Sequence, residues 1–120
     1  MSYGEVMASR TFTELAHPDQ AQLQFPTVLA ALSDPIRLAI VARLADLEPD
    51  GELACTTLAV PVSKSTQSAH FKVLREAGVI RQRDEGTRRM NRLRREDLNA
   101  RFPGLLDLAI QQGRDIAASW

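Results

Sequence analysis

Apolar residues recur with helical spacing along most of this chain. They repeat every three or four positions from about residue 19 to residue 47, within 63–77, and again after Pro103. Such spacing gathers apolar side chains on one face of a helix and predicts helices in these regions. Residues 79–84 and 88–93 flank Glu85-Gly86-Thr87, which predicts a hairpin. The chain is therefore expected to be mainly α-helical with one small β-hairpin.

Capping residues divide the helical regions. Asp34 followed by Pro35 predicts a helix start, because Asp caps free N–H groups and Pro fits the first turn. It separates a helix over about 19–32 from a second helix over 35–47. Ser63 predicts the start of the helix 63–77, and Gly78 predicts its end. Before this helix, residues 52–55 are expected to form an edge strand and residues 56–59 a one-turn helix.

The expected order of elements defines a fold class. Two helices, a short strand, a one-turn helix, the helix 63–77, a hairpin and a last helix make up an α+β winged helix-turn-helix. In that fold the helix 63–77 would lie in the major groove of DNA. Residues 1–18 are weakly patterned and are expected to form a flexible extension, whereas residues 19–120 are expected to form a single DNA-binding and dimerisation domain.

The positive charge is concentrated in one segment. The whole chain has 15 basic and 15 acidic residues and a formal net charge of zero. From Lys64 to Arg95 there are ten Lys and Arg against three acids. A helix followed by a basic hairpin suits a polyanion, because the helix can enter a groove while the hairpin grips phosphates. A merely solvated surface is the other interpretation of this segment.

Cysteine usage and hydropathy limit the cellular setting. A single cysteine, Cys55, excludes an intrachain disulfide and is typical of a reducing cytoplasm. No apolar run could span a bilayer, and the first ten residues lack the order of a signal peptide. We therefore expect a soluble, cytoplasmic protein with no membrane partner. Cys55 is expected to be a small buried side chain; as a reactive thiol it would need a disulfide partner from another molecule.

Two helical motifs and the hairpin resemble those of the ArsR/SmtB family of bacterial winged-helix repressors. Residues 31–44 (A-L-S-D-P-I-R-L-A-I-V-A-R-L) resemble its opening helix, and E-G-T-R-R at 85–89 its wing. Residues 63–80 (S-K-S-T-Q-S-A-H-F-K-V-L-R-E-A-G-V-I) resemble its recognition helix. The resemblance covers about residues 28–93. It implies a homodimer, paired through its first and last helices, that binds an imperfect palindrome and is released by an effector.

The metal-sensing motifs of that family do not match. Where one subgroup has two cysteines separated by one residue, Cys55 stands alone between Ala54 and Thr56. One thiolate cannot supply the three or four ligands of a tight soft-metal site. Another subgroup pairs Asp with His on the last helix, which has no histidine here. We expect no cofactor and no metal site, although carboxylates and His17 of two subunits could assemble a nickel or zinc effector site.

The recognition helix 63–77 has polar and basic residues on the side opposite its apolar stripe. Those in its first turns are expected to reach base edges, and the later basic ones to reach phosphates. Gln67 shares the spacing of Phe71 but could bind an adenine edge. His70 could contact a phosphate or pack against the wing. The expected DNA contacts of this helix are Lys64, Ser65, Gln67, Ser68, His70, Lys72 and Arg75.

The wing, residues 79–93, is expected to lie on the backbone or in the minor groove through Arg83, Arg88 and Arg89. Asp84 and Glu85 would oppose phosphates, so the tip would bend away.

The last helix has a broader apolar stripe than a small winged helix needs for its core. We therefore expect it to pair with the first helix across a dimer seam. The residues expected there are Leu23, Val28, Phe102, Leu106, Ala109, Ile110 and Ile116.

These features together predict a sequence-specific DNA-binding transcriptional repressor, acting as a dimer on a palindromic operator. The alternative is a protein-interaction module, or a repressor whose sensing comes from a separate partner protein, since no sensor motif matches. Two histidines, one cysteine and no phosphate-cradling glycine loop offer no nucleophile–base pair, so no enzyme activity is expected.

Overall fold

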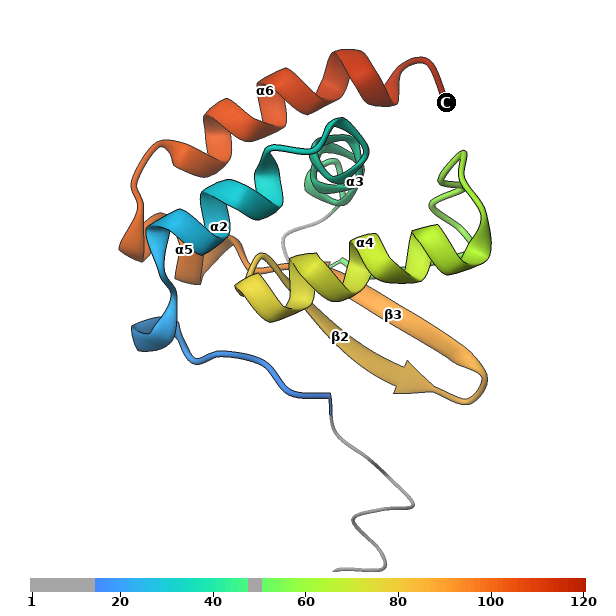
Figure 1. Ribbon diagram of the computed structural model, residues 1–120, viewed down its shortest axis with the longest axis horizontal. Helices are drawn as coiled ribbons and strands as arrows, with labels where there is room; N and C mark the ends of the chain where they lie inside the picture. Colours follow the sequence, from blue (N-terminus) through green and yellow to red (C-terminus); the bar gives the residue numbers. More distant parts are fainter. Residues whose placement is uncertain (1–14, 48–50) are drawn as a thin grey trace, which may run out of the picture.

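The helices of the protein pack around α3, with a small sheet below them (Figure 1). The computed structural model describes residues 15–47 and 51–120. Its elements are the 3-10 turn η1 (Gln20–Gln22), α2 (Phe25–Leu32), α3 (Pro35–Ala45), β1 (Leu53–Ala54), α4 (Lys64–Ala77), β2 (Ile80–Glu85), β3 (Arg88–Leu93), α5 (Arg95–Arg101) and α6 (Leu105–Ala117). In Figure 1, α6 and α2 lie at the top, α4 crosses the middle and the hairpin lies below. This is the α+β winged helix-turn-helix expected from the sequence.

The predicted caps are present at the start of α3 and at both ends of α4. The carboxylate of Asp34 accepts hydrogen bonds from the backbone N–H groups of Ile36 and Arg37 and so begins α3. The hydroxyl of Ser63 accepts from the N–H of Thr66 and begins α4. Gly78 ends α4 at φ +88°, a left-handed conformation that disfavours a Cβ. These caps explain why the sequence located α3 and α4 closely.

The first predicted helix is shorter than expected. Instead of running from about residue 19, the chain forms η1, passes through extended residues at Leu23 and Gln24, and begins α2 at Phe25. Pro26 lies in the first turn of α2, where its missing N–H has no helical partner to lose. Of the expected extension 1–18, residues 1–14 lie outside the described residues. Residues 15–18 contact the domain: Nε2 of His17 accepts a hydrogen bond from the N–H of Gln82 at 2.9 Å.

The predicted one-turn helix over 56–59 is wrong. These residues form successive turns, with the N–H groups of Thr57 and Leu58 both bonded to the carbonyl of Ala54. Ala59 has a φ of +53°, which a helix does not allow. Leu58 is fully buried and anchors the turns to the core. The first helix of the helix-turn-helix is therefore replaced by a compact turn before α4.

The three strands form an antiparallel sheet in the order β1-β3-β2. Ile80 pairs with Leu93, Gln82 with Asn91, and Glu85 with Arg88 next to the turn. The hairpin turn at Gly86 and Thr87 has two residues, and the φ of Gly86 is +62°, as tight hairpin turns favour. The predicted hairpin is confirmed, and its tip projects from the domain (Figure 1).

The core joins all the main helices, and its closest contact is between α3 and α6. Gly113 of α6 faces the backbone of α3: a Cβ at this position would overlap the carbonyl oxygen of Leu38 and lie 3.1 Å from Cβ of Ala42. The absence of a side chain at Gly113 therefore lets the two helices approach. Within the described part of the chain, no helix is both long and apolar enough to cross a membrane.

Candidate DNA-binding surface

The outer face of α4 is mostly polar because the large apolar residues of this helix, apart from Val73, turn inward. Phe71, Leu74 and Ala77 are buried in the core. The opposite side is open to solvent and includes four of the expected DNA contacts, Lys64, Ser65, Ser68 and Lys72. Neither lysine forms an ion pair or hydrogen bond with any residue that the structure describes. Their charges are thus available to an external anion.

Gln67 does not belong to this open face. Its Nε2 donates a hydrogen bond to the carbonyl oxygen of Cys55 at 2.8 Å. The side chain therefore fastens α4 to the turn that precedes it. This contact conflicts with the expectation that the Gln67 amide binds an adenine edge. The helical spacing that Gln67 shares with Phe71 predicted its inward position better.

His70 lies against the start of α3 rather than against the wing. Its Nδ1 is 3.2 Å from Nη1 of Arg37 and 3.9 Å from the carboxylate of Asp34. Nε of Arg37 in turn donates to the carbonyl of Ala31 at 2.6 Å. His70 thus helps to hold α4 on the α2–α3 corner.

Arg75 is used to connect α4 with the wing. Its Nη1 donates to Oε1 of Gln82 on β2 at 2.9 Å, and Nε2 of Gln82 donates to Oδ1 of Asn91 on β3 at 2.7 Å. Asn91 donates further, to the carbonyl of Leu53 and to Sγ of Cys55. Gln82 and Asn91 are buried. This Arg75–Gln82–Asn91 network fixes the angle between the helix and the hairpin, and the phosphate contact expected of Arg75 would have to use its remaining N–H groups.

The three expected wing arginines differ in how they are engaged. Arg83 forms a bidentate pair with Glu52, at 2.7 and 3.0 Å, and also contacts Glu85 at 2.9 Å. Arg89 pairs with Asp84 at 2.8 Å. Arg88, beside the turn, has no ion pair or hydrogen bond among the described residues and is exposed. Of these three arginines, Arg88 is therefore the one whose charge is not paired with another described residue.

The pKa values of the wing agree with this division. The hydrogen bond from Arg89 lowers the pKa of Asp84. The hydrogen bonds to Glu52 and Glu85 raise the pKa of Arg83. Both pairs are exposed, and exposed ion pairs are weak and screened by salt. Phosphates could replace the acids in these pairs, but only by breaking contacts that the free protein already makes.

Most residues expected at a dimer seam are buried inside the single chain. Leu23, Val28, Leu106, Ala109 and Ile110 are at most 7% exposed, so a partner subunit could not contact them appreciably. This part of the prediction is wrong because the last helix packs tightly on α3 and uses its broad stripe as core. Phe102 and Ile116 remain partly exposed. The ring of Phe102 packs on Phe25 with centroids 5.4 Å apart.

Three large apolar side chains outside the expected seam are exposed on α2 and α6, and we refer to this set as the apolar patch. It consists of Phe25 and Leu29, one turn apart on α2, and Leu108 on α6, with exposed fractions of 47%, 46% and 56%. Both helices lie at the top of the molecule in Figure 1, away from the hairpin. The four-residue spacing of Phe25 and Leu29 could have indicated a second apolar face on α2. Leu108 lies outside the apolar stripe of α6, so no sequence pattern indicated its exposure.

Cys55 is half-buried beside β1. Burial raises the pKa of its thiol, although the hydrogen bond from Asn91 acts in the opposite direction. A thiol with a raised pKa has little thiolate at neutral pH and reacts slowly. Within residues 15–47 and 51–120, no three His, Cys, Asp or Glu side chains gather as a metal ion would require.

The fold and this surface are those of a winged helix-turn-helix DNA-binding protein, and known proteins agree. Residues 32–83 match the model of a helix-turn-helix domain. The chain is 35% identical over 91 residues to the uncharacterized HTH-type transcriptional regulator YceK of Bacillus subtilis, covering 74% of this chain and 86% of that protein. It is 46% identical over 65 residues to the HTH-type transcriptional regulator Rv2034 of Mycobacterium tuberculosis, covering 52% of this chain and 57% of the relative.

The fold also matches a crystal structure of an ArsR family transcriptional regulator. The TM-score is 0.56 at 22% identity, and the match covers 85% of this chain and all of the other. The chain therefore belongs to the helix-turn-helix transcriptional regulators, with an ArsR-like winged fold. The family resemblance seen in the sequence is confirmed.

Proposed function

We propose that the protein is a sequence-specific transcriptional repressor that binds a palindromic operator as a homodimer. Each subunit would place α4 in a major groove and its wing on the adjoining backbone or minor groove. The regulators related to it by sequence support the general role, and the exposed face of α4 supports the mode of binding.

The observation that carries this proposal is the set of exposed polar groups on one side of the molecule. Lys64, Ser65 and Ser68 are exposed in the first turns of α4, and Lys72 follows on the same helix. The N-terminal end of α4 and the hairpin turn that bears Arg88 both lie toward the right of Figure 1. A helix start and a wing tip directed the same way match the two contacts that a winged helix makes with one stretch of duplex.

The dimer is supported by the exposed apolar patch of Phe25, Leu29 and Leu108. Large apolar side chains exposed on a surface favour an interface with a partner. A two-fold axis through this patch would pair the subunits through α2 and α6 and leave both α4 helices open. The two recognition helices would then have to lie about 34–36 Å apart, one turn of DNA, to meet consecutive half-sites.

The test is binding to DNA from upstream of the protein's own gene, measured by fluorescence anisotropy against scrambled DNA over a range of salt. We expect tighter binding to the upstream DNA, with an affinity that falls as salt rises. Equal binding to both DNAs at every salt concentration would contradict a sequence-specific repressor.

A second candidate is a winged helix that binds another protein. The observation that favours it is the wing itself, where Glu52, Glu85 and Asp84 already neutralise Arg83 and Arg89. The same measurement decides between the two functions: a protein module would bind neither DNA selectively, even in low salt.

A further inference from the structure

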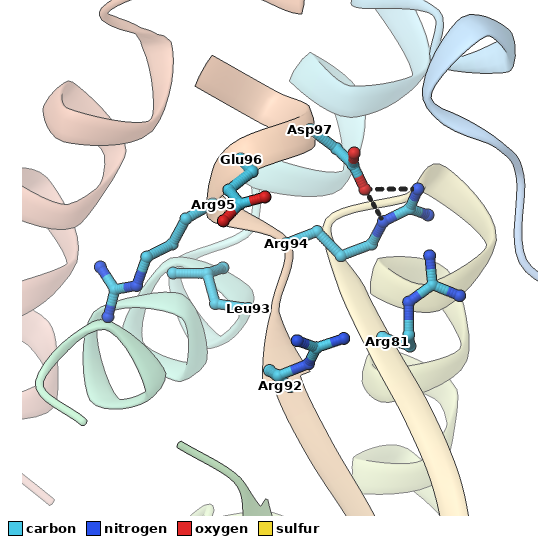
Figure 2. Close-up of a pocket in the computed structure, with 7 residues that line it drawn as sticks. All are labelled: Arg81, Arg92, Leu93, Arg94, Arg95, Glu96 and Asp97. Carbon is cyan, nitrogen blue, oxygen red and sulfur yellow. Dashed lines mark hydrogen bonds and ion pairs between the residues drawn. The ribbon is translucent and has the colours of Figure 1, made fainter. Parts of the chain in front are cut away.

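A pocket lies at the base of the hairpin, where β3 leads into α5 (Figure 2). Its volume is about 210 Å³. The charged residues that line it are Arg81, Arg92, Arg94, Arg95, Glu96 and Asp97. Four cations against two acids make it a basic pocket, away from the DNA-binding surface described above.

Two of these arginines are committed to the fold. Arg94 is buried; its Nε and Nη2 contact Asp97 at 2.9 and 2.8 Å, and its Nη1 donates to the carbonyl of Pro18 at 2.7 Å. Arg95 points the other way, with its Nη2 donating to the carbonyl of Ala45 at 2.6 Å. The carboxylate of Asp97 is thus paired with Arg94, and it also accepts a hydrogen bond from Gln20.

Arg81 is different, because it has no hydrogen bond or ion pair with any described residue. It stands directly opposite Arg92 in the β2–β3 register, and Figure 2 shows it beside Arg94. Like charges directly opposite each other destabilise a sheet. Partial burial, and then the charge of Arg94, lower the pKa of Arg81. A guanidinium stays protonated nonetheless, so this cluster retains its charge.

We propose that this pocket binds a small oxyanion, held by the guanidinium group of Arg81, with the charges of Arg92 and Arg94 beside it. The fork of an Arg side chain matches the geometry of phosphate and carboxylate groups, so Arg81 could bind one such group through two N–H groups. The volume favours a small ligand, since pockets for larger organic molecules begin at about 300 Å³. The ligand class is a small free molecule or ion that carries a phosphate or carboxylate group.

The position of the pocket argues against a phosphate of DNA as this ligand. The Arg81–Arg92 pair is four register positions from the Glu85–Arg88 pair at the tip. At about 3.3 Å per residue, the two lie roughly 13 Å apart along the hairpin. An anion at the base would therefore bind independently of a duplex held by the tip and α4. The site does not depend on the proposed function as a repressor.

The experiment uses inorganic phosphate as the probe, without DNA. Heat of binding and Tm are measured against phosphate concentration, with chloride added to match ionic strength. We expect saturable binding and a rising Tm for the native protein, because a ligand that binds only the folded state stabilises it. Arg81→Gln should weaken phosphate binding by roughly ten-fold or more, the loss of one charge-assisted contact. Without phosphate, this variant should have an equal or higher Tm, since it removes a repulsion.

Arg88→Gln is the matched control, because it removes the same charge from an exposed position of the same hairpin. It should bind phosphate like the native protein. Arg81→Lys keeps the charge but loses the fork, and should fall between the native protein and Arg81→Gln. Three results would overturn the proposal: no saturable binding by the native protein, equal weakening in Arg81→Gln and Arg88→Gln, or weaker DNA binding in Arg81→Gln without any phosphate binding, which would assign the site to the duplex.

Discussion

Arg75 of α4 and Gln82 of β2 are joined by a hydrogen bond of 2.9 Å, made by a charged donor to a buried neutral amide. Because Gln82 also donates to Asn91, this one side chain connects the recognition helix with both strands of the hairpin. The angle of the wing is therefore fixed by an internal polar contact, which solvent and salt reach poorly.

Replacing Gln82 should destabilise the protein. Gln82→Ala leaves Arg75 and Asn91 with unpaired groups near the core, and each such group costs about 1–3 kcal/mol. Unfolding in urea measures the difference. Gln111→Ala, an exposed position on α6, is the control and should change stability by less than about 0.5 kcal/mol. Equal stabilities of the two variants would mean that the network contributes nothing.

Gly113→Ala should also destabilise, although alanine is the better helix former. Propensity alone would favour this change by about 1 kcal/mol. The added Cβ would instead meet the carbonyl oxygen of Leu38, and overpacking of this kind typically costs about 1–3 kcal/mol. The sign of the change in Tm distinguishes the two effects. The neighbouring exposed residue supplies the control, Gln112→Ala, which should leave Tm almost unchanged.

The two parts of the DNA-binding surface should respond differently to substitution. Lys64→Ala or Ser68→Ala should alter the preferred sequence, since these side chains lie where base edges are read. Arg88→Ala should weaken binding to all DNA about equally. It should reduce the salt slope by about 2 for a dimer, at about 0.9 per lost phosphate contact. Anisotropy over a salt series measures both effects.

Arg114→Ala is the control for these measurements. Arg114 lies on α6 and pairs with Asp46, and neither residue belongs to α4 or to the wing. It should bind every DNA as the native protein does. Unchanged binding by Lys64→Ala, Ser68→Ala and Arg88→Ala alike would rule out the proposed docking of α4 and the wing.

An acid placed in the apolar patch should separate the dimer. Leu108→Glu puts a charge on a side chain that is 56% exposed in the single chain, so the fold should persist while association is lost. Sedimentation velocity would show a shift from dimer to monomer. Val73→Glu makes the same kind of change on α4, 38% exposed, and should leave the dimer intact. A native protein that sediments as a monomer would contradict the dimer directly.

His17 should make stability depend on pH. Burial, and then the charge of Arg81, lower the pKa of His17 below 6.5, and its Nε2 must be unprotonated to accept from Gln82. The unfolded chain therefore binds a proton at a higher pH than the folded chain, so stability is full above about 6.5 and falls below it. Denaturation of native protein and His17→Gln between pH 7.5 and 5 tests this, and the native protein should lose more. Parallel pH curves would show that the contact is unimportant.

Much of the fold could be predicted because its signals are local. Asp34, Ser63 and Gly78 act on residues within one turn, and a two-residue hairpin loop limits the strands beside it. The one-turn helix that was wrongly predicted over 56–59 is different: these residues have weak helical signals, and the burial of Leu58 decides their conformation.

The side chains of the surface were harder to predict because their partners are distant in the sequence. Gln67 bonds to a residue 12 positions away, and Arg83 pairs with Glu52, 31 positions away. The sequence next to Gln67 or Arg83 contains no pattern that predicts these contacts. Ile80 and Gln82 are two positions apart and so lie on the same face of β2. This spacing is the one signal that could have indicated the Arg75–Gln82–Asn91 network.

The ion pairs of Arg83 and Arg89 in the wing affect how strongly salt would weaken DNA binding. If only Lys64, Lys72 and Arg88 of each subunit release counterions, a dimer would show a salt slope of about −5, at about 0.9 for each of six phosphates. The segment that contains them has ten cations, which would suggest a far steeper dependence. A regulator that keeps part of its charge satisfied internally would hold its operator through an osmotic upshift that strips more heavily charged proteins from DNA.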